Sequence, residues 1–162
     1  MEYTRNSDLN HYKEFQTSTN CGSYALRLNE WYHLNLLFEE QMGEWTYTWI
    51  RDRAEEGYTE CEISTLYGNI LARCMLAEFK GDLEICDGTP PETDDVELVA
   101  LNTFCYCDDP ECFESIDSDF HFKVFRDGVW KEKCGRQAVR ECNGSFWGGY
   151  IGQPIYFYHK IK

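Results

Sequence analysis

The longest amphipathic pattern in the sequence lies in its first half, and mainly strand-like segments follow it. Between Thr59 and Phe79, apolar residues recur at the three- and four-residue spacing of a helix that packs on one face. Gly81 comes next and is typical of a helix end. Helices first and strands later predict an α+β fold, in which N-terminal helices pack on one side of an antiparallel sheet. The main strand-like segments are residues 96–104, 120–125, 129–133 and 154–161.

Shorter elements are expected around these segments. Good N-cap residues lead into a possible helix over residues 21–31. Alternation of apolar and polar residues over 44–50 favours a short strand or an extended lid. Residues 83–86 fit a brief strand, and the turn at 126–128 is typical of a β-hairpin.

The length of the chain matches one domain. We expect a single domain over residues 1–162, with a polar lead-in at 1–17 and acidic loops at 87–95 and 105–118. The first residues contain no apolar segment, and no run of about 18 apolar residues occurs, so neither a secretory signal nor a membrane span is expected. The nine cysteines are an odd number, which favours reduced thiols in a cytoplasm.

Negative charge is concentrated in the middle of the chain. Residues 82–119 contain 13 acidic residues and no basic residue, whereas residues 120–162 contain 8 basic and 3 acidic residues. The net charge of −14 opposes binding to phosphate backbones and anionic lipid, so we expect no direct nucleic-acid or membrane partner. Either the acidic segment is a solvated loop, or it is a face that docks a basic partner such as a nucleic-acid-binding protein.

Cys21 and His121 are the candidate catalytic pair. Cys21 follows a run of N-cap residues, and a thiol in the first turn of a helix is favoured as thiolate by the helix dipole. His121 lies in a strand-like run about a hundred residues later. A cysteine at a helix start and a distant strand histidine are the residues that a thiol nucleophile and its general base require. The competing interpretation is a buried structural cysteine.

Acyl transfer at a thiol also needs donors for the oxyanion that forms. The backbone N–H of the cysteine usually supplies one donor, and a side-chain amide supplies another. Gln16 and Asn20 are the nearest side-chain amides before Cys21, and either is a candidate for this role.

The segment Asn20-Cys21-Gly22-Ser23-Tyr24-Ala25-Leu26 resembles the nucleophile segment of papain-like cysteine peptidases and amidases. Over residues 15–160 the chain is also similar to poorly characterised bacterial and phage proteins. These share an Asn-Cys-x-x-Tyr-Ala-Leu motif, a long helix, a strand with Asp-Phe/Tyr-His-Phe and a later Gly-x-Trp-Ser-His-Lys motif. The sequence supplies Asp119-Phe120-His121-Phe122 and Gly128-Val129-Trp130-Lys131-Glu132-Lys133 for the last two. The resemblance implies a papain-like fold.

Glu132 departs from that pattern, which has a second histidine after the tryptophan. If the position orients the catalytic imidazole, a glutamate still serves as a hydrogen-bond acceptor. Alternatively, the catalytic site has decayed and the fold serves only for binding.

The remaining cysteines offer a possible metal site. Cys105, Cys107 and Cys112, with Cys134 or Cys142 further on, are candidate zinc ligands in the acidic segment. Their spacing is not the paired C-x₂-C signature, and unpaired loop cysteines or an occasional disulfide are the alternatives.

Two functions from different classes follow. The first is a papain-like cysteine hydrolase that cleaves a peptide, isopeptide or amide bond of a protein or peptide substrate and needs no cofactor. The second is a non-catalytic acidic protein of a phage or mobile element, of the anti-defence or anti-CRISPR type. It would inhibit a basic intracellular partner in the host cytoplasm.

Overall fold

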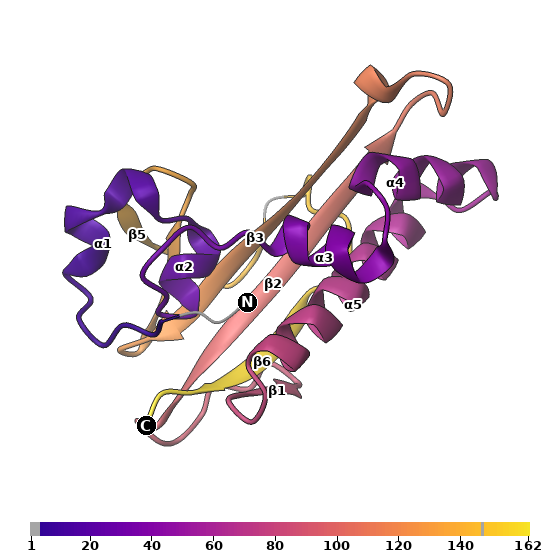
Figure 1. Cartoon of the computed structure of the whole chain (residues 1–162). Helices are drawn as coiled ribbons and strands as arrows, with labels where there is room; N and C mark the ends of the chain where they lie inside the picture. Colours follow the sequence, from indigo (N-terminus) through magenta and orange to yellow (C-terminus); the bar gives the residue numbers. More distant parts are fainter. Residues whose placement is uncertain (1–3, 147) are drawn as a thin grey trace.

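The computed structural model describes residues 4–146 and 148–162, with helices in the first half of the chain and strands in the second (Figure 1). The helices are α1 (His11–Glu14), α2 (Cys21–Ala25), α3 (Leu34–Met42), α4 (Thr46–Glu55) and α5 (Glu60–Glu78), with short 3₁₀ turns at Gln16–Ser18 and Phe113–Ser115. The strands are β1 (Leu83–Cys86), β2 (Val96–Cys107), β3 (Ile116–Arg126), β4 (Val129–Lys133), β5 (Val139–Cys142) and β6 (Ile155–Lys160). The predicted α+β fold is confirmed.

The strands form one antiparallel sheet in the order β1-β6-β2-β3-β4-β5. The long strands β2 and β3 run side by side across the molecule, and α3, α4 and α5 lie along them (Figure 1). Helices α1 and α2 lie toward the end of the sheet that carries β4 and β5 (Figure 1).

The core lies between α5 and the middle of the sheet. Val99 and Leu101 of β2 are fully buried, and Thr103 on the same strand donates from Oγ1 to the carbonyl of Ser64 at 2.7 Å. Gly68 permits this close approach, because a Cβ there would lie 3.1 Å from the Thr103 hydroxyl. The buried stripe of α5 includes Ile63, Tyr67, Leu71 and Met75.

β3 leaves part of one edge open. It pairs with β4 at only three positions, from Val124 opposite Lys131 to Arg126 opposite Val129. Within the described chain, no named strand pairs with residues 116–123 of β3 on that side. α2 instead packs against β3 and β4. The start of α2 is therefore brought to the open part of the β3 edge.

The long helix, the brief strand at 83–86 and the hairpin of β3 and β4 are confirmed, with the final strand as β6. The helix expected over 21–31 is shorter, because α2 ends at Ala25. The strand or lid expected over 44–50 is wrong, because this segment begins α4. The Glu39 carboxylate, at the end of α3, accepts from the backbone N–H and the hydroxyl of Thr46 and so satisfies a donor at the helix start.

Candidate functional site

Cys21 and His121 line one cleft, with a volume of about 1220 Å³. The start of α2 forms part of its wall, and β3 forms another part. Further walls come from the α3–α4 segment and from residues between 132 and 150. The fold thus brings Cys21, the predicted nucleophile, and His121, the predicted base, to the same cavity from α2 and β3, which are far apart in the sequence.

The position of Cys21 is fixed by the residue before it. Asn20 caps α2: its Oδ1 accepts from the Ser23 backbone N–H at 3.0 Å and from the Tyr32 N–H at 3.1 Å. Its Nδ2 donates to the Tyr32 carbonyl at 3.0 Å. Gly22 permits tight packing here, because a Cβ at that position would lie 2.7 Å from the Tyr32 ring. The capping and the packing together hold the first turn of α2 in one place.

Two buried cations from the sheet hold the ends of α2. Lys133, in β4, donates from Nζ to the carbonyls of Gln16, Thr19 and Gly135. Arg126, in β3, donates from Nη2 to the carbonyls of Tyr24 and Ala25, at 3.2 and 3.3 Å. The first contacts tie down the chain that enters the helix, and the second satisfy carbonyls at its C-terminal end.

Glu132 lies beside His121, as the orienting role requires. The Glu132 Oε1 is 2.7 Å from His121 Nε2, and its Oε2 accepts from Arg140 Nε at 2.9 Å. Burial alone would raise the pKa of Glu132, but the hydrogen bonds from His121 and Arg140 lower it below its usual value. Glu132 is therefore a carboxylate at neutral pH and can only accept, so the proton of a neutral His121 sits on Nε2. The lone pair then lies on Nδ1.

Burial keeps both members of the catalytic pair neutral in this state. It raises the pKa of the Cys21 thiol to about 12, against weaker opposing hydrogen bonds from the backbone of Phe122 and Gly22. Burial also lowers the pKa of His121, while the hydrogen bond and the charge of Glu132 act in the other direction. A helix start lowers the pKa of a thiol, but α2 has only five residues. The effect of desolvation on the pKa of Cys21 is therefore the larger of the two.

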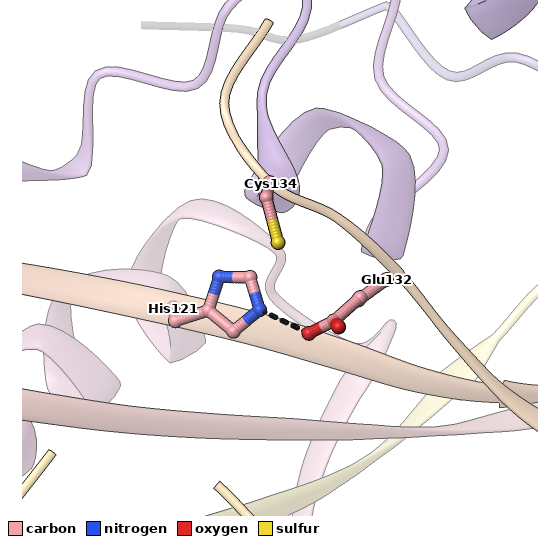
Figure 2. A group of neighbouring side chains, drawn as sticks. All are labelled: His121, Glu132 and Cys134. Carbon is pink, nitrogen blue, oxygen red and sulfur yellow. Dashed lines mark hydrogen bonds and ion pairs between the residues drawn. The ribbon is translucent and has the colours of Figure 1, made fainter. Parts of the chain in front are cut away.

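Cys134 is a cleft residue whose place the sequence reasoning missed, because it was considered there only as a zinc ligand. It follows β4 and lines the cleft. Figure 2 shows its side chain pointing toward the imidazole of His121, while Glu132 approaches Nε2. The Arg140 Nη2 lies 3.3 Å from its sulfur. No sequence motif marks Cys134, and only the path of the chain after β4 brings it to His121.

The candidate zinc ligands Cys105, Cys107, Cys112 and Cys134 do not form one group in the part of the chain that the structure describes. Within the described residues, the group of three potential ligands found together is His121, Glu132 and Cys134, whose ligand atoms all lie within 4.8 Å of one another. It includes Cys134 but not Cys105, Cys107 or Cys112, because Cys105 is buried in the core and Cys112 is exposed. All nine cysteines are free thiols.

The charges around that group do not suit a divalent cation. Arg140 already contacts both Glu132 and Cys134, and Lys123 Nζ lies 3.9 Å from Glu132 Oε1. Two positive charges thus stand where a metal ion would need net negative charge. The donor set fits zinc by residue type, but its electrostatic surroundings fit the ionised Glu132 of a catalytic pair better.

The two candidate oxyanion donors differ in place. Gln16 is not among the cleft residues, and its Nε2 donates to the Arg136 carbonyl at 3.2 Å. Asn20 lines the cleft, but its amide is engaged in capping α2. The first-turn N–H groups of Cys21 and Gly22 have no acceptor within the helix, as in any helix start. The backbone donors that act on the Cys21 sulfur in this structure are those of Phe122 and Gly22.

Comparison with known protein families, curated proteins and solved structures found no match to this chain. In the part of the chain that the structure describes, no helix combines the length and apolar composition needed to cross a lipid bilayer.

Proposed function

We propose that the protein is a papain-like cysteine hydrolase that cleaves a peptide, isopeptide or amide bond. Cys21 is the nucleophile, His121 the general base and acid, and Glu132 the residue that orients the imidazole. The observation that carries the proposal is the shared cleft of Cys21 and His121, with Glu132 bonded to the Nε2 of that histidine. This leaves the lone pair of His121 on Nδ1, and the proposal requires the Cys21 thiol to deliver its proton there.

The reaction starts from a neutral thiol and a neutral imidazole. As the Cys21 sulfur attacks the carbonyl carbon, its proton moves to His121, and the imidazolium is stabilised by the carboxylate of Glu132. The backbone N–H groups at the start of α2 donate to the oxyanion. His121 then protonates the leaving amine, and the carbon–nitrogen bond breaks to leave a thioester on Cys21.

Hydrolysis of the thioester reverses the proton path. His121 removes a proton from water, whose oxygen attacks the thioester carbon, and the proton returns to the departing sulfur. The products are a carboxylic acid and the original thiol, and no cofactor takes part in these steps. Cys21 is the nucleophile rather than Cys134 because it stands at a helix start, where oxyanion donors are available.

The test combines hydrolysis of a fluorogenic peptide-amide library with cysteine mapping by mass spectrometry after limited iodoacetamide treatment. We expect Cys21→Ser to abolish hydrolysis. His121→Ala should slow hydrolysis, and alkylation of Cys21 at neutral pH, by about a hundredfold or more, which is the usual contribution of a general base. Cys134→Ser is the matched control, because it removes the second thiol beside His121 and should retain turnover. Hydrolysis that survives Cys21→Ser, or that is lost in Cys134→Ser alone, would contradict the assignment.

A binding function is the second candidate, and the exposed acidic hairpin between β2 and β3 favours it. Asp108, Asp109, Glu111, Glu114 and Asp117 are all exposed there. The other acidic loop, at 87–95, precedes β2, so the two loops lie at opposite ends of that twelve-residue strand and do not form one face. A basic partner whose affinity falls steeply with salt and survives Cys21→Ala would support this function.

A further inference from the structure

Asp119 is a cleft carboxylate that the proposed chemistry does not use. It lies on β3 two residues before His121 and lines the same cleft. Its Oδ2 accepts a hydrogen bond from the Tyr150 hydroxyl at 3.4 Å. Among the ion pairs of the described residues, none joins Asp119 to a lysine or an arginine.

The cations that line the cleft are engaged elsewhere. Lys123 donates from Nζ to the carbonyls of Asn143 and Ser145, at 2.9 and 2.6 Å. Arg140 is bonded to Glu132. Desolvation raises the pKa of Asp119 above its usual value, although the residue is exposed at the cleft surface and its Oδ1 accepts from the Phe120 N–H. Asp119 is thus an acidic group at the cleft surface that is paired with no lysine or arginine of the described residues.

Three tyrosines line the same cleft as this carboxylate. Burial raises the pKa of the Tyr47, Tyr67 and Tyr150 phenols, and the charge of Asp119 adds to this effect at each of them. Aromatic faces attract cations through their quadrupole, and the attraction grows when the cation is desolvated. A carboxylate within a group of tyrosines is thus suited to an organic cation with an apolar stem.

We propose that Asp119 and these tyrosines form a cation subsite, which holds the ammonium or guanidinium of a lysine or arginine side chain next to the bond that Cys21 attacks. This assignment of substrate class rests on the proposed hydrolase function. It makes Asp119 a specificity residue and basic peptides the preferred substrates.

Asp119 also acts on both members of the candidate pair. Its charge adds to the burial that raises the pKa of the Cys21 thiol, and it raises the pKa of His121. A bound cation offsets both effects, which act in opposite directions on proton transfer from the thiol to the imidazole. We therefore expect a basic side chain to lower KM more than it changes kcat.

The first experiment compares two fluorogenic peptide amides that differ only in lysine or norleucine beside the scissile bond. We expect kcat/KM of the unaltered protein to favour the lysine substrate by about tenfold or more, the usual effect of a charged hydrogen bond in a partly desolvated site. Asp119→Asn should remove the preference, so that its kcat/KM values for the lysine and norleucine substrates become similar. Asp117→Asn is the matched control, because Asp117 lies two residues away on the same strand, is exposed and does not line the cleft.

A preference that survives Asp119→Asn, or that is absent from the unaltered protein, overturns the inference. A second measurement separates it from the hydrolase proposal. Calorimetry of the Cys21→Ala protein with Nα-acetyl-lysine amide should show binding that Asp119→Asn abolishes and that the norleucine analogue lacks. Such binding, without turnover in the Cys21-containing protein, would contradict the hydrolase proposal and support the cation subsite. Hydrolysis of neutral substrates without lysine binding would support the hydrolase proposal and contradict the cation subsite.

Discussion

At the scale of single residues, the contact between His121 and Glu132 decides what the cleft can do. The side chains are largely buried, with 12% and 7% of their surfaces exposed. Glu132 is held as a carboxylate by His121 and Arg140, so it fixes the proton of a neutral His121 on Nε2. A glutamate at this position therefore supplies the hydrogen-bond acceptor that a residue orienting an imidazole needs.

Replacing that carboxylate should change the pH dependence in a defined direction. In Glu132→Gln, the pKa of His121 loses the charge of Glu132 and its hydrogen bond to a carboxylate, which are the two largest influences that raise it, so it should fall further below its usual value. The base form then persists to lower pH, and the acid limb of kcat/KM shifts to lower pH. The plateau should drop by about a hundredfold, because an amide fixes the imidazole poorly and does not stabilise the imidazolium.

The measurement is a pH–rate profile of peptide-amide hydrolysis for both proteins. Glu141→Gln is the control, since Glu141 also lines the cleft but is exposed. An acid limb that moves to higher pH in Glu132→Gln would show that Glu132 does not act through His121.

At the scale of elements, α2 is a helix that depends on its neighbours. With five residues it is too short to be stable by itself. Lys133 donates to the Thr19 carbonyl just before α2, and Arg126 donates to the Tyr24 carbonyl near its C-terminal end. The capping residue Asn20 also donates to the backbone of Tyr32. The position of Cys21 is therefore set by strands β3 and β4, from which these two cations come.

Lys133→Met should test this dependence. The change leaves the carbonyls of Gln16 and Thr19 without their ammonium donor, so we expect a loss of about 3 kcal/mol in the free energy of unfolding. Because the backbone that enters α2 is released, kcat should fall more than KM rises. Urea denaturation and steady-state kinetics measure the two effects.

Lys131→Met is the matched control for that experiment. Lys131 lies two residues earlier on β4 and pairs with the exposed Asp127 at 3.5 Å, so its loss should cost about 0.5 kcal/mol or less. Equal losses of stability in the two variants would show that Lys133 has no special part in holding α2.

At the scale of the whole molecule, buried ionisable groups join the N-terminal segment to the sheet. Glu97 of β2 accepts from Arg27 and from Arg126, in a largely buried cluster. The Arg5 guanidinium contacts His159 Nε2 at 2.6 Å, so this nitrogen accepts and the ring is neutral. Both contacts link residues far apart in sequence, and both depend on protonation.

Acid should destabilise the fold in two steps. Burial, aided by the charge of Arg5, lowers the pKa of His159 to about 3 from 6.5. The unfolded chain therefore binds the additional proton between these values, and stability falls as the pH is lowered below 6.5. Burial would raise the pKa of Glu97, but the bonds from Arg27 and Arg126 outweigh it and lower the pKa to about 2 from 4.5. Its stabilisation is present above pH 4.5 and is lost as the pH falls toward 2.

Thermal or urea unfolding as a function of pH separates the two groups. Between pH 6.5 and 4.5 the lowered pKa values of His159 and His121 both contribute, so His159→Asn should reduce the decline in that window without abolishing it. Glu97→Gln should cost about 3–5 kcal/mol at neutral pH, because two buried guanidinium groups lose their partner. Glu84→Gln, at an exposed position of β1, should cost little. An unchanged slope in His159→Asn would refute the first assignment.

Much of the fold was predictable because its signals are local. α5 follows the apolar spacing of its own residues and a capping box at Thr59, and the β3–β4 hairpin follows a turn at Asp127 and Gly128 with positive φ at both. The candidate pair, Cys21 and His121, was also visible, since each stands in a recognisable local context. Glu132 was found through a resemblance between motifs.

The tertiary structure decided what depends on residues far apart in the chain. α2 ends at Ala25, where Arg126 of β3 donates to the carbonyls of Tyr24 and Ala25, and Lys133 of β4 holds the chain that enters this helix. The protonation state of Cys21 was decided in the same way: the sequence shows a helix start, which favours a thiolate, and only burial shows that desolvation outweighs it. Local spacing thus determines which helices and strands can form. Their assembly determines which side chains share a cleft and which of them carry charge, because desolvation and distant hydrogen bonds exist only in the folded chain.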